Sequence, residues 1–512
     1  MPTPEELEVI RIHRQRRHRN KMWRSRPIVS APLTAPARFV NGMFTENRIG
    51  SMDAGSNTLT ITSEAYANDK FSMFEVGDPI IVATGGEAGA GLFGTVGVGG
   101  VFTATPDGNY YNSQQNPIAL RTTVVTVSSD GKILTLADSA VVATIDAEVW
   151  FNNQPLIQAM HSESHAPGHT VTYPAGTFAI GDAIGVTGGS VDWILNGAGK
   201  GVTNFKWPKG CTGTFFTFQS HGVEISDFSI IGNVADESFG RNSNEYQAGI
   251  IVIATTDAFV HDCAIHNVFQ KAVWAQGGGS NDIVVTDCDV ILQVPYRNYL
   301  SQWFFGVNDS VGGTFTRCNV NSNFIQTGYE TFRSSGVKFI DCVSRNGVVS
   351  SNSSGSFEFT RFNITIEALS QPLGPGDSVY HHLSPAVNIN SNIQPPDASM
   401  LLGGIITDMV LTIEGYMNTN NEVHKGVVIN VDNPNITING GIVTYTSPAL
   451  VGKENGCAGL NSTGENTVVN DLTVVGNSRD AFDFNIAVQD GSVTNCTAAL
   501  INCVGPNCVL TP

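Results

Sequence analysis

The chain has few charged residues. Only 14% of its 512 residues are Asp, Glu, Lys or Arg, against about 25% in ordinary soluble domains. Coiled coils and charged disordered chains need more charge than this, and the 54 glycines weigh against a helix-rich enzyme. The hydrophobic fraction of 41% is nevertheless that of a folded protein.

The few charges are unevenly distributed. Residues 11–26 contain 8 of the 27 Lys and Arg and no acidic residue, whereas residues 27–512 carry 19 Lys and Arg against 42 Asp and Glu. An acidic body disfavours nucleic acid as the main ligand, because phosphates bind where cations gather. A weakly charged surface of this kind suits neutral, hydroxyl-rich ligands better than polyanions.

Cysteine is scarce as well. The nine Cys residues are an odd number, and no two of them are spaced as CxxC, so neither a disulfide scaffold nor the common zinc motifs are expected. His161, His165 and His169 recur every four residues, but Pro167-Gly168 would break a helix before the third of them. We therefore predict no metal site and no cofactor.

Long apolar runs are absent. No run approaches the roughly 20 residues of a membrane-spanning helix, and the basic N-terminus lacks the apolar stretch of a secretory signal. The sequence therefore predicts that the protein is made in a cytoplasm and does not insert into a membrane.

Residues 1–26 are predicted to form a basic helix. Thr3 and Glu6 make a capping box, Pro4 takes the first helical position, and the basic residues follow the acidic ones as the helix dipole prefers. The apolar side chains lie only in its first half, so such a helix needs a partner to be stable. Docking into a larger assembly is the favoured interpretation, with a solvated tail or a nucleic-acid contact as alternatives.

Two further segments precede the main body. Residues 27–56 are predicted to be an extended linker because prolines punctuate them. Residues 57–150 contain short β-rich runs separated by turn signals, including Asp130-Gly131 between two such runs, and are predicted to form a small β domain. The GxGxxG match at Gly89–Gly94 has no helix after it and is interpreted as a surface loop.

A short pattern then repeats along the rest of the chain. It consists of an apolar residue, any residue, then Asp, Arg or Asn, and finally Cys or another apolar residue. It occurs at Ile225–Phe228, Val260–Cys263, Val285–Cys288, Phe315–Cys318, Phe339–Cys342, Phe359–Phe362, Ile406–Met409, Val469–Leu472 and Val493–Cys496.

Strand-sized units that recur every 20–35 residues without intervening helices predict a β-solenoid over residues 151–512. Its coils would stack about 4.8 Å apart, so that like residues lie above one another. Five cysteines would then form one interior ladder of small buried side chains: Cys263, Cys288, Cys318, Cys342 and Cys496.

Segments at the start of the repeats resemble a known fold. They read Asn153-Gln-Pro-Leu-Ile-Gln-Ala159, Pro167-Gly-His-Thr-Val-Thr-Tyr-Pro-Ala-Gly-Thr-Phe178 and Ile194-Leu-Asn-Gly-Ala-Gly-Lys-Gly201. They are similar to the capping helix, first strand and second-coil turn of the pectate-lyase-like parallel β-helix superfamily. The resemblance implies an all-β protein: a right-handed parallel β-helix (a β-solenoid) preceded by a small β domain and an N-terminal helix.

That superfamily holds lyases, hydrolases, epimerases and bacteriophage tailspikes. The chain lacks the paired Asp-Asp and Gly-His-Gly of polygalacturonases, and it lacks the clustered Asp residues of calcium-dependent lyases. Its basic N-terminus and acidic solenoid resemble a tailspike, which implies a homotrimer in the virion tail, made in the host cytoplasm. Residues 1–56 would attach to tail or adaptor proteins, and residues 151–512 would bind a host surface polysaccharide.

The favoured function is hydrolysis of that polysaccharide, with a non-catalytic receptor-binding spike and a polysaccharide lyase as alternatives. Aromatic residues precede the repeat by 11–15 residues in consecutive coils and could stack on sugar rings; the alternative is that they point into the core. The predicted substrate-binding residues are Trp274, Trp303, Tyr329, Tyr296, Arg297 and Arg333.

Glycoside hydrolysis needs two carboxyl groups about 5–9.5 Å apart. Asp309 and Glu330 are the predicted catalytic pair because they lie on neighbouring coils beside the aromatic residues. Glu245 and Asp236 are the next candidates. The alternative for each acid is a role as a turn cap or a solvated surface residue.

Overall fold

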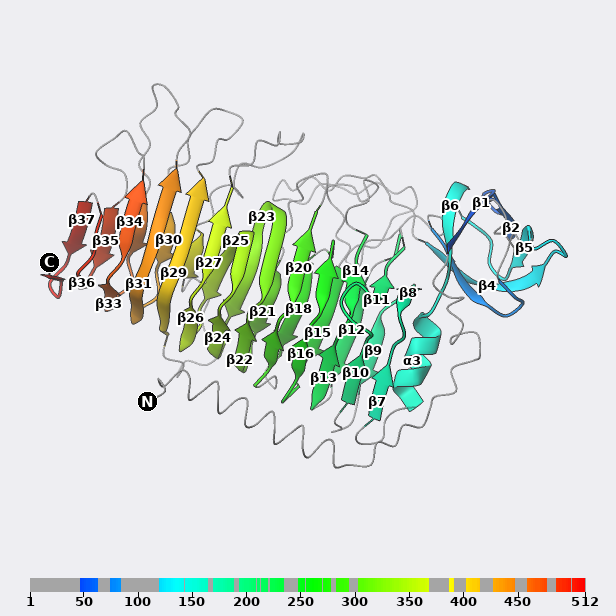
Figure 1. Ribbon diagram of the computed structural model, residues 1–512, viewed down its shortest axis with the longest axis horizontal. Coiled ribbons are helices and arrows are strands. Elements are labelled where there is room, and N and C mark those ends of the chain that lie inside the picture. Colours follow the sequence, from blue (N-terminus) through cyan, green and yellow to red (C-terminus); the bar gives the residue numbers. More distant parts are fainter. Residues whose placement is uncertain are drawn as a thin grey trace, which may run out of the picture.

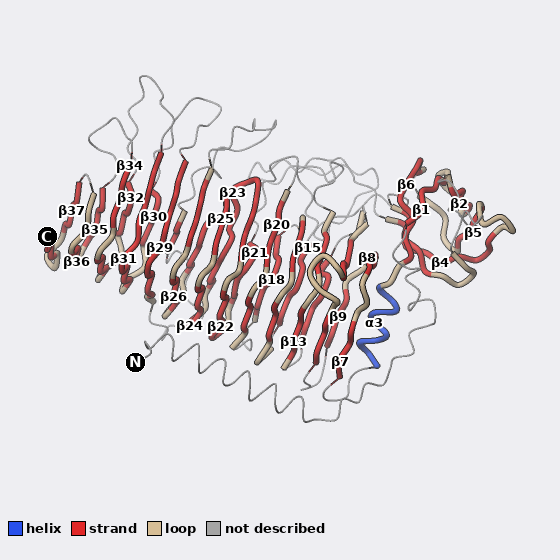
Figure 2. Tube along the Cα trace, viewed as in Figure 1, coloured by secondary structure: helices blue, strands red, loops and turns tan. Residues whose placement is uncertain are grey.

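The computed structural model is elongated and built almost entirely of β-strands (Figures 1 and 2). It describes residues 47–62, 74–83, 119–141, 143–163, 169–187, 193–208, 210–211, 213–219, 222–233, 247–253, 255–268, 270–277, 282–293, 303–367, 386–390, 402–414, 427–446, 458–476, 485–498 and 500–511. Within these ranges no helix is long and apolar enough to cross a membrane. The predicted helix at residues 1–26 lies outside them.

Six strands near the start of the described chain close into a barrel in the order β1-β2-β5-β4-β3-β6. They are β1 (Asn47–Met52), β2 (Thr58–Ile61), β3 (Pro79–Val82), β4 (Leu120–Val127), β5 (Ile133–Leu136) and β6 (Thr144–Phe151). The predicted turn at Asp130-Gly131 joins β4 to β5, with Ser128 donating its backbone N–H to the carbonyl of Ile133.

The first strand of the barrel lies inside the segment 27–56 that the sequence suggests is linker. β1 pairs with both β2 and β6, so this part of the linker prediction is wrong. The strand reads NRIGSM, and its Asn, Gly and Ser have low β-propensity. Tertiary packing compensates: a Cβ on Gly50 would lie 2.8 Å from the Leu59 side chain, so glycine lets β1 approach β2.

From residue 169 onward the described chain winds into a parallel β-helix, as predicted (Figure 1), and its strand pairings divide it into three sheets. The first sheet consists of β7 (His169–Thr172), β10 (Trp193–Asn196), β13 (Val223–Ser226), β16 (Phe259–His261), β19 (Val284–Thr286), β22 (Val311–Thr316), β24 (Ser335–Ile340), β26 (Phe357–Thr360), β29 (Gly404–Glu414), β31 (Ile436–Thr446), β33 (Thr467–Asn470), β36 (Gly491–Thr494) and β38 (Val509–Thr511).

Four long strands, β23 (Asn319–Phe332), β25 (Val343–Asn352), β29 and β31, bend from one sheet into the next. The second sheet contains β8 (Gly176–Ala179), β11 (Thr203–Lys206), β14 (Ser229–Ile231), β17 (Ala264–His266), β20 (Asp289–Leu292), β27 (Asn363–Ile366) and β34 (Thr473–Gly476). The third contains β9 (Ile184–Thr187), β12 (Gly213–Gln219), β15 (Gln247–Ile253), β18 (Gln270–Gln276), β21 (Trp303–Asn308), β28 (Val387–Asn390), β30 (Val427–Val431), β32 (Ala458–Ser462), β35 (Asn485–Gln489) and β37 (Leu500–Val504).

The repeated Asp, Arg or Asn sits at the turn between the first and second sheets. In every copy of the repeat this residue has a positive φ of 50–62°. Asp and Asn tolerate this left-handed conformation better than most side chains. Where Arg replaces them, it pairs with Asp of the preceding coil: Arg317 Nη2 lies 2.6 Å from Asp287, and Arg361 Nε lies 2.6 Å from Asp341.

Four of the five cysteines of the predicted ladder are buried as predicted, and the fifth, Cys496, is only partly buried. Cys263, Cys288, Cys318 and Cys342 are fully buried and lie in four consecutive coils. Backbone hydrogen bonds join these coils: the residue that follows each later cysteine donates its N–H to the carbonyl of the cysteine in the preceding coil. Cys496 occupies the same position at the far end of the solenoid, after Phe362, Met409, Gly441 and Leu472. Burial raises the pKa of the Cys263 and Cys318 thiols well above its usual value, as expected of packing residues.

The solenoid begins under a short helix, α3 (Gln154–Glu163), as the resemblance implies (Figure 2). The Gln158 amide donates to the carbonyl of Gly185 at 2.7 Å and accepts from the N–H of Gly185 at 3.0 Å. Gly185 lies on β9, so α3 covers backbone groups that no earlier coil pairs with. His161 lies in α3 and His169 begins β7, so the histidines that recur every four residues are divided between a helix and a strand.

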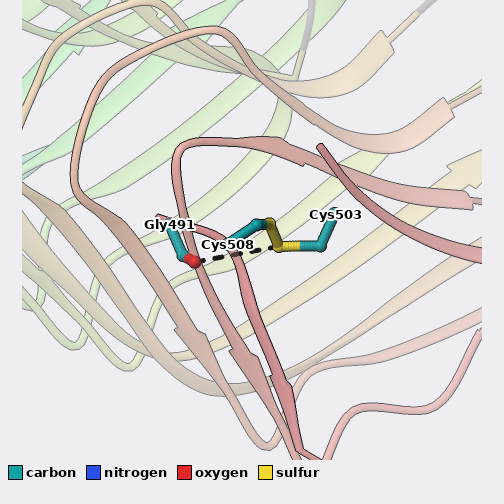
Figure 3. The surroundings of a disulfide bond; sticks show 3 residues. All are labelled: Gly491, Cys503 and Cys508. Atoms are coloured by element: carbon teal, nitrogen blue, oxygen red, sulfur yellow. Dashed lines mark hydrogen bonds between the residues drawn. A yellow bond between two sulfur atoms is a disulfide. The ribbon is translucent and has the colours of Figure 1, made fainter. Parts of the chain in front are cut away.

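The far end of the described solenoid carries a disulfide between Cys503 and Cys508, whose Cα atoms are 5.7 Å apart (Figure 3). It spans the turn from β37 to β38, and Cys503 Sγ lies 3.7 Å from the carbonyl oxygen of Gly491. The sequence does not predict this bridge because local pairing of two cysteines in a turn leaves no scaffold-like spacing.

Candidate functional site

The outer face of the third sheet carries the predicted site residues that can meet a ligand. Strand alternation places every second side chain outward, and the register aligns these side chains in rows across the coils. The central row is Trp274, Gly306, Glu330, Ser350, Asn388, Asn430 and Asn461. One flanking row is Lys271, Trp303 and Thr327, and the other is Gln276, Asn308, Phe332, Asn352 and Asn390.

Glu330 is the notable titratable group of the central row. Its neighbours on β23, Tyr329 and Thr331, are fully buried on the opposite, interior side, and Glu330 itself is only 6% exposed. Burial raises its pKa from 4.5 to about 8, and the positive charge of Lys271 only partly offsets this effect. Glu330 therefore holds a proton at neutral pH, as a general acid must.

Trp274 lies two strands from Glu330 in the same row, over Gly306. A Cβ on Gly306 would lie 2.3 Å from Cζ3 of the indole, so the ring rests on the glycine backbone. Trp274 is 3% exposed and packs with Ala248 and Ile251 in a small apolar cluster separate from the solenoid core. It therefore forms the floor of the site and exposes little surface for stacking on sugar.

Trp303 and Lys271 complete this end of the site. The Trp303 ring is partly exposed and lies 6.2 Å from the Trp274 ring, tilted by 47°. Lys271 Nζ lies 4.8 Å from the centre of the Trp274 ring and donates to Gln276 Oε1 at 3.2 Å. Burial lowers the pKa of Lys271. Of the three predicted stacking residues, Trp303 is thus the one whose ring reaches the surface.

The fit of Trp274 on Gly306 gives a prediction. The Gly306→Ala variant should lower the melting temperature by the equivalent of about 1–3 kcal/mol, because the new methyl group forces the indole away. It should also shift tryptophan fluorescence to longer wavelength. Gly185→Ala on β9 is the control, since nothing lies within 4 Å of its Cβ. Equal effects in the two variants would contradict this packing.

Asp309 lies in the turn that follows β21, not in the strand. Its φ is +51°, and its carboxylate forms an ion pair with Arg333, which lies at the same turn of the next coil. The Arg333 guanidinium also lies 5.1 Å from the Phe332 ring centre. Arg333 is therefore paired with Asp309, which by its conformation is a turn residue.

The two predicted catalytic acids are not in contact. Asp309 follows Gly306 by three residues, and Gly306 is the register partner of Glu330. Three residues at about 3.3 Å and one strand spacing of about 4.8 Å put the Cα atoms roughly 11 Å apart.

Tyr329 does not belong to the site, so its prediction as a sugar-binding residue is wrong. Its side chain is fully buried in the core, where it stacks on Phe305 with ring centres 5.6 Å apart. Its hydroxyl oxygen lies 2.7 Å from the carbonyl oxygens of both Cys318 and Val343, and its single proton can be donated to one of them at a time. The spacing from the repeat was correct, but Tyr329 and Glu330 are adjacent and must point to opposite faces.

This position predicts how Tyr329 contributes. Tyr329→Phe should destabilise the protein by about 0.5–1.5 kcal/mol, because the buried hydroxyl and its one hydrogen bond are lost. Retention of polysaccharide should not change. Thermal unfolding and a retention assay on the same preparation measure both effects, and weaker retention at unchanged stability would restore a ligand-binding role.

Sequence analysis missed the polar half of this face. Beyond Glu330 the central row continues as Ser350, Asn388, Asn430 and Asn461, all half-buried. Asn430 Nδ2 donates to Asn388 Oδ1 at 3.2 Å in the adjacent coil. A usable signal was present in the sequence. Asn388 and Asn390 alternate with apolar residues, and Asn430 and Asn461 each directly follow an apolar residue.

Other predicted site residues lie outside the described chain: Asp236, Glu245, Tyr296 and Arg297. Position 165 of the histidine series is also outside it. The described residues contain no group of three His, Cys, Asp or Glu side chains that could hold a metal ion.

No protein-family model matches the chain, and no curated protein is significantly similar to it. Solved structures similar to it include the catalytic unit of an α-1,3-glucanase from Streptomyces thermodiastaticus (14% identity, TM-score 0.40, covering 91% of this chain and 89% of that chain). Others are a surface adhesin of Streptococcus pneumoniae (12%, 0.45, 70% and 87%) and the tailspike protein of Pseudomonas phage LKA1 (13%, 0.34, 88% and 62%). One fold can carry many activities.

Proposed function

We propose that this protein is a bacteriophage tailspike that binds a host cell-surface polysaccharide on the outer face of the third sheet and hydrolyses its glycosidic bonds. The observation that carries the proposal is Glu330: a nearly buried carboxyl group, whose pKa burial raises to about 8, in the central row between Gly306 and Ser350. An isolated structural acid gains nothing from such a position, since burial without a partner costs stability.

Glu330 is the proposed proton donor to the leaving glycosidic oxygen. Asp309 is the proposed base, which would take a proton from the attacking water while Arg333 holds the carboxylate in place. Trp303 would stack on one sugar ring, because its ring is partly exposed beside the acid. No cofactor enters this scheme.

The virion assignment extends the same proposal. The long solenoid would project outward, a homotrimer would form along it, and residues 1–56 would bind tail or adaptor proteins. The acidic balance of residues 27–512 fits a surface that meets carbohydrate rather than nucleic acid. Sedimentation of the purified protein at three times the monomer mass supports this assignment, and sedimentation at monomer mass at micromolar concentration contradicts it.

A lyase is the second candidate, and Lys271 is the observation that favours it. Burial lowers the pKa of this lysine, which makes it a better base for elimination next to a uronate carboxyl group. A non-catalytic spike would use the same face for binding alone.

One experiment separates the three functions. The protein is incubated with a panel of purified bacterial capsules and lipopolysaccharides. New reducing ends indicate hydrolysis, absorbance of an unsaturated uronate indicates a lyase, and retention without fragments indicates a receptor-binding spike. The proposal predicts reducing ends, and a panel that is neither retained nor cleaved would contradict it.

A further inference from the structure

We infer that the polysaccharide is uncharged and lies along the solenoid axis, over the amides of the central row. This inference rests on the proposed function and specifies its substrate class. It concerns the row Ser350, Asn388, Asn430 and Asn461 and the flanking residues Asn308, Asn352 and Asn390, which together form the amide face.

The chemistry of the amide face matches sugar hydroxyls. An Asn side chain carries no charge and has both donors and an acceptor, as a hydroxyl does. The donors of Asn430 are engaged by Asn388 and Asp432, which leaves its Oδ1 to accept from a sugar hydroxyl. Asn308 Oδ1 and Asn390 Oδ1 are buried and have no hydrogen-bond partner in the described part of the chain. Buried acceptors without a donor are unfavourable, and sugar hydroxyls are donors of the kind that would satisfy them.

The charges around this face argue against an anionic polymer. In the central and flanking rows the charged residues are Lys271 and Glu330. Lys271 is bonded to Gln276 and lies against the Trp274 ring, while Arg333 at the adjoining turn is paired with Asp309. Arg333 is thus neutralised by Asp309, and the described rows present Lys271 alone rather than a cluster of cations for a uronate or phosphate polymer.

Acidic residues border the amide face as well. Asp432 follows β30, accepts from Asn430 Nδ2 at 3.1 Å and from the Thr463 hydroxyl at 2.5 Å. A carboxylate at this position would repel an anionic sugar bound over Asn430. The hydrogen bond from Asn430 Nδ2 to Asp432 holds the Asn430 amide in one orientation, in which it could meet a neutral ligand.

The direction of the polymer follows from the register. The amides occupy the same position in successive coils, about 4.8 Å apart. This spacing is close to the length of one sugar unit in an extended chain. A polysaccharide parallel to the axis would therefore meet one amide per sugar unit on its way to Glu330.

The test uses immobilised bacterial capsules and lipopolysaccharide O-chains, both uncharged and anionic, at low and high salt. We expect retention only of uncharged polymers, at the same affinity in both salts, because screening affects charged partners alone. Asn430→Ala should weaken retention about tenfold, the typical value of a lost hydrogen bond in a binding site. Asn388→Ala should behave alike.

The matched control is Asn439→Ala on the first sheet. Asn439 is likewise half-buried and accepts from Asn470 of the adjacent coil at 2.9 Å, so this variant removes an equivalent Asn–Asn pair elsewhere. Equal losses in both variants would overturn the inference. Salt-sensitive retention of an anionic polymer, lost in Glu330→Gln or Asn430→Ala, would overturn it while leaving the proposed function intact. Retention of no polymer would overturn both.

Discussion

Replacing Glu330 with Gln is expected to reduce the release of reducing ends from a retained polysaccharide at least ~10²-fold, the usual contribution of a positioned general acid. The amide keeps the shape of the side chain but has no proton to donate to the leaving oxygen. Retention of the polymer should persist, because the Asn and Ser of the amide face are unchanged.

The control for this variant is Glu358→Gln. Glu358 lies on β26 of the first sheet, partly exposed and paired with Lys338 at 2.8 Å, so its loss should leave the rate unchanged. Asp309→Asn tests the proposed base and should cause a comparable loss of rate. Full activity in the Glu330→Gln protein would exclude this residue as the acid.

The second large effect concerns stability and pH. The folded pKa of Glu330, about 8, is above its ordinary value of 4.5 because the side chain is buried. A raised folded pKa means that its stabilising contribution is complete below pH 4.5 and is lost as pH rises through 8. Glu330→Gln removes this dependence, so it should be more stable than the wild-type protein at alkaline pH, by on the order of 5 kcal/mol.

Melting temperatures measured from pH 4 to pH 9 check this expectation. The advantage of the Glu330→Gln protein should grow across this range and level off above the folded pKa. A melting temperature is the appropriate quantity because a chain with a barrel and a long solenoid need not unfold in two states. A constant difference between the two proteins at all pH values would show that Glu330 titrates as an ordinary surface acid.

Sequence alone predicted the solenoid because its signal is repeated many times. Each copy of the pattern places an apolar residue inward, a turn residue at positive φ and a Cys or apolar residue in the ladder, and these requirements act together. The strand β1 was missed because it has no such repetition: NRIGSM becomes a strand through its partners β2 and β6.

The site was predicted less completely. Spacing from the repeat identified the correct coils, but Tyr329 and Glu330 are one residue apart, and spacing cannot say which of them faces outward. Asp309 was read as a neighbour of Glu330, whereas the chain turns at Asp309 with a positive φ and a bond to Arg333. The amides were missed because single Asn residues between apolar ones resemble turn or edge positions.

The central claim is that polysaccharide binds on the outer face of the third sheet beside Glu330. A crystal structure of the Glu330→Gln protein with an uncleaved oligosaccharide of a retained polymer tests it most directly. We predict a saccharide along the central row, with one glycosidic oxygen within hydrogen-bond distance of the side chain at position 330 and a ring against Trp303. A saccharide bound elsewhere, with no contact to this face, would contradict the account.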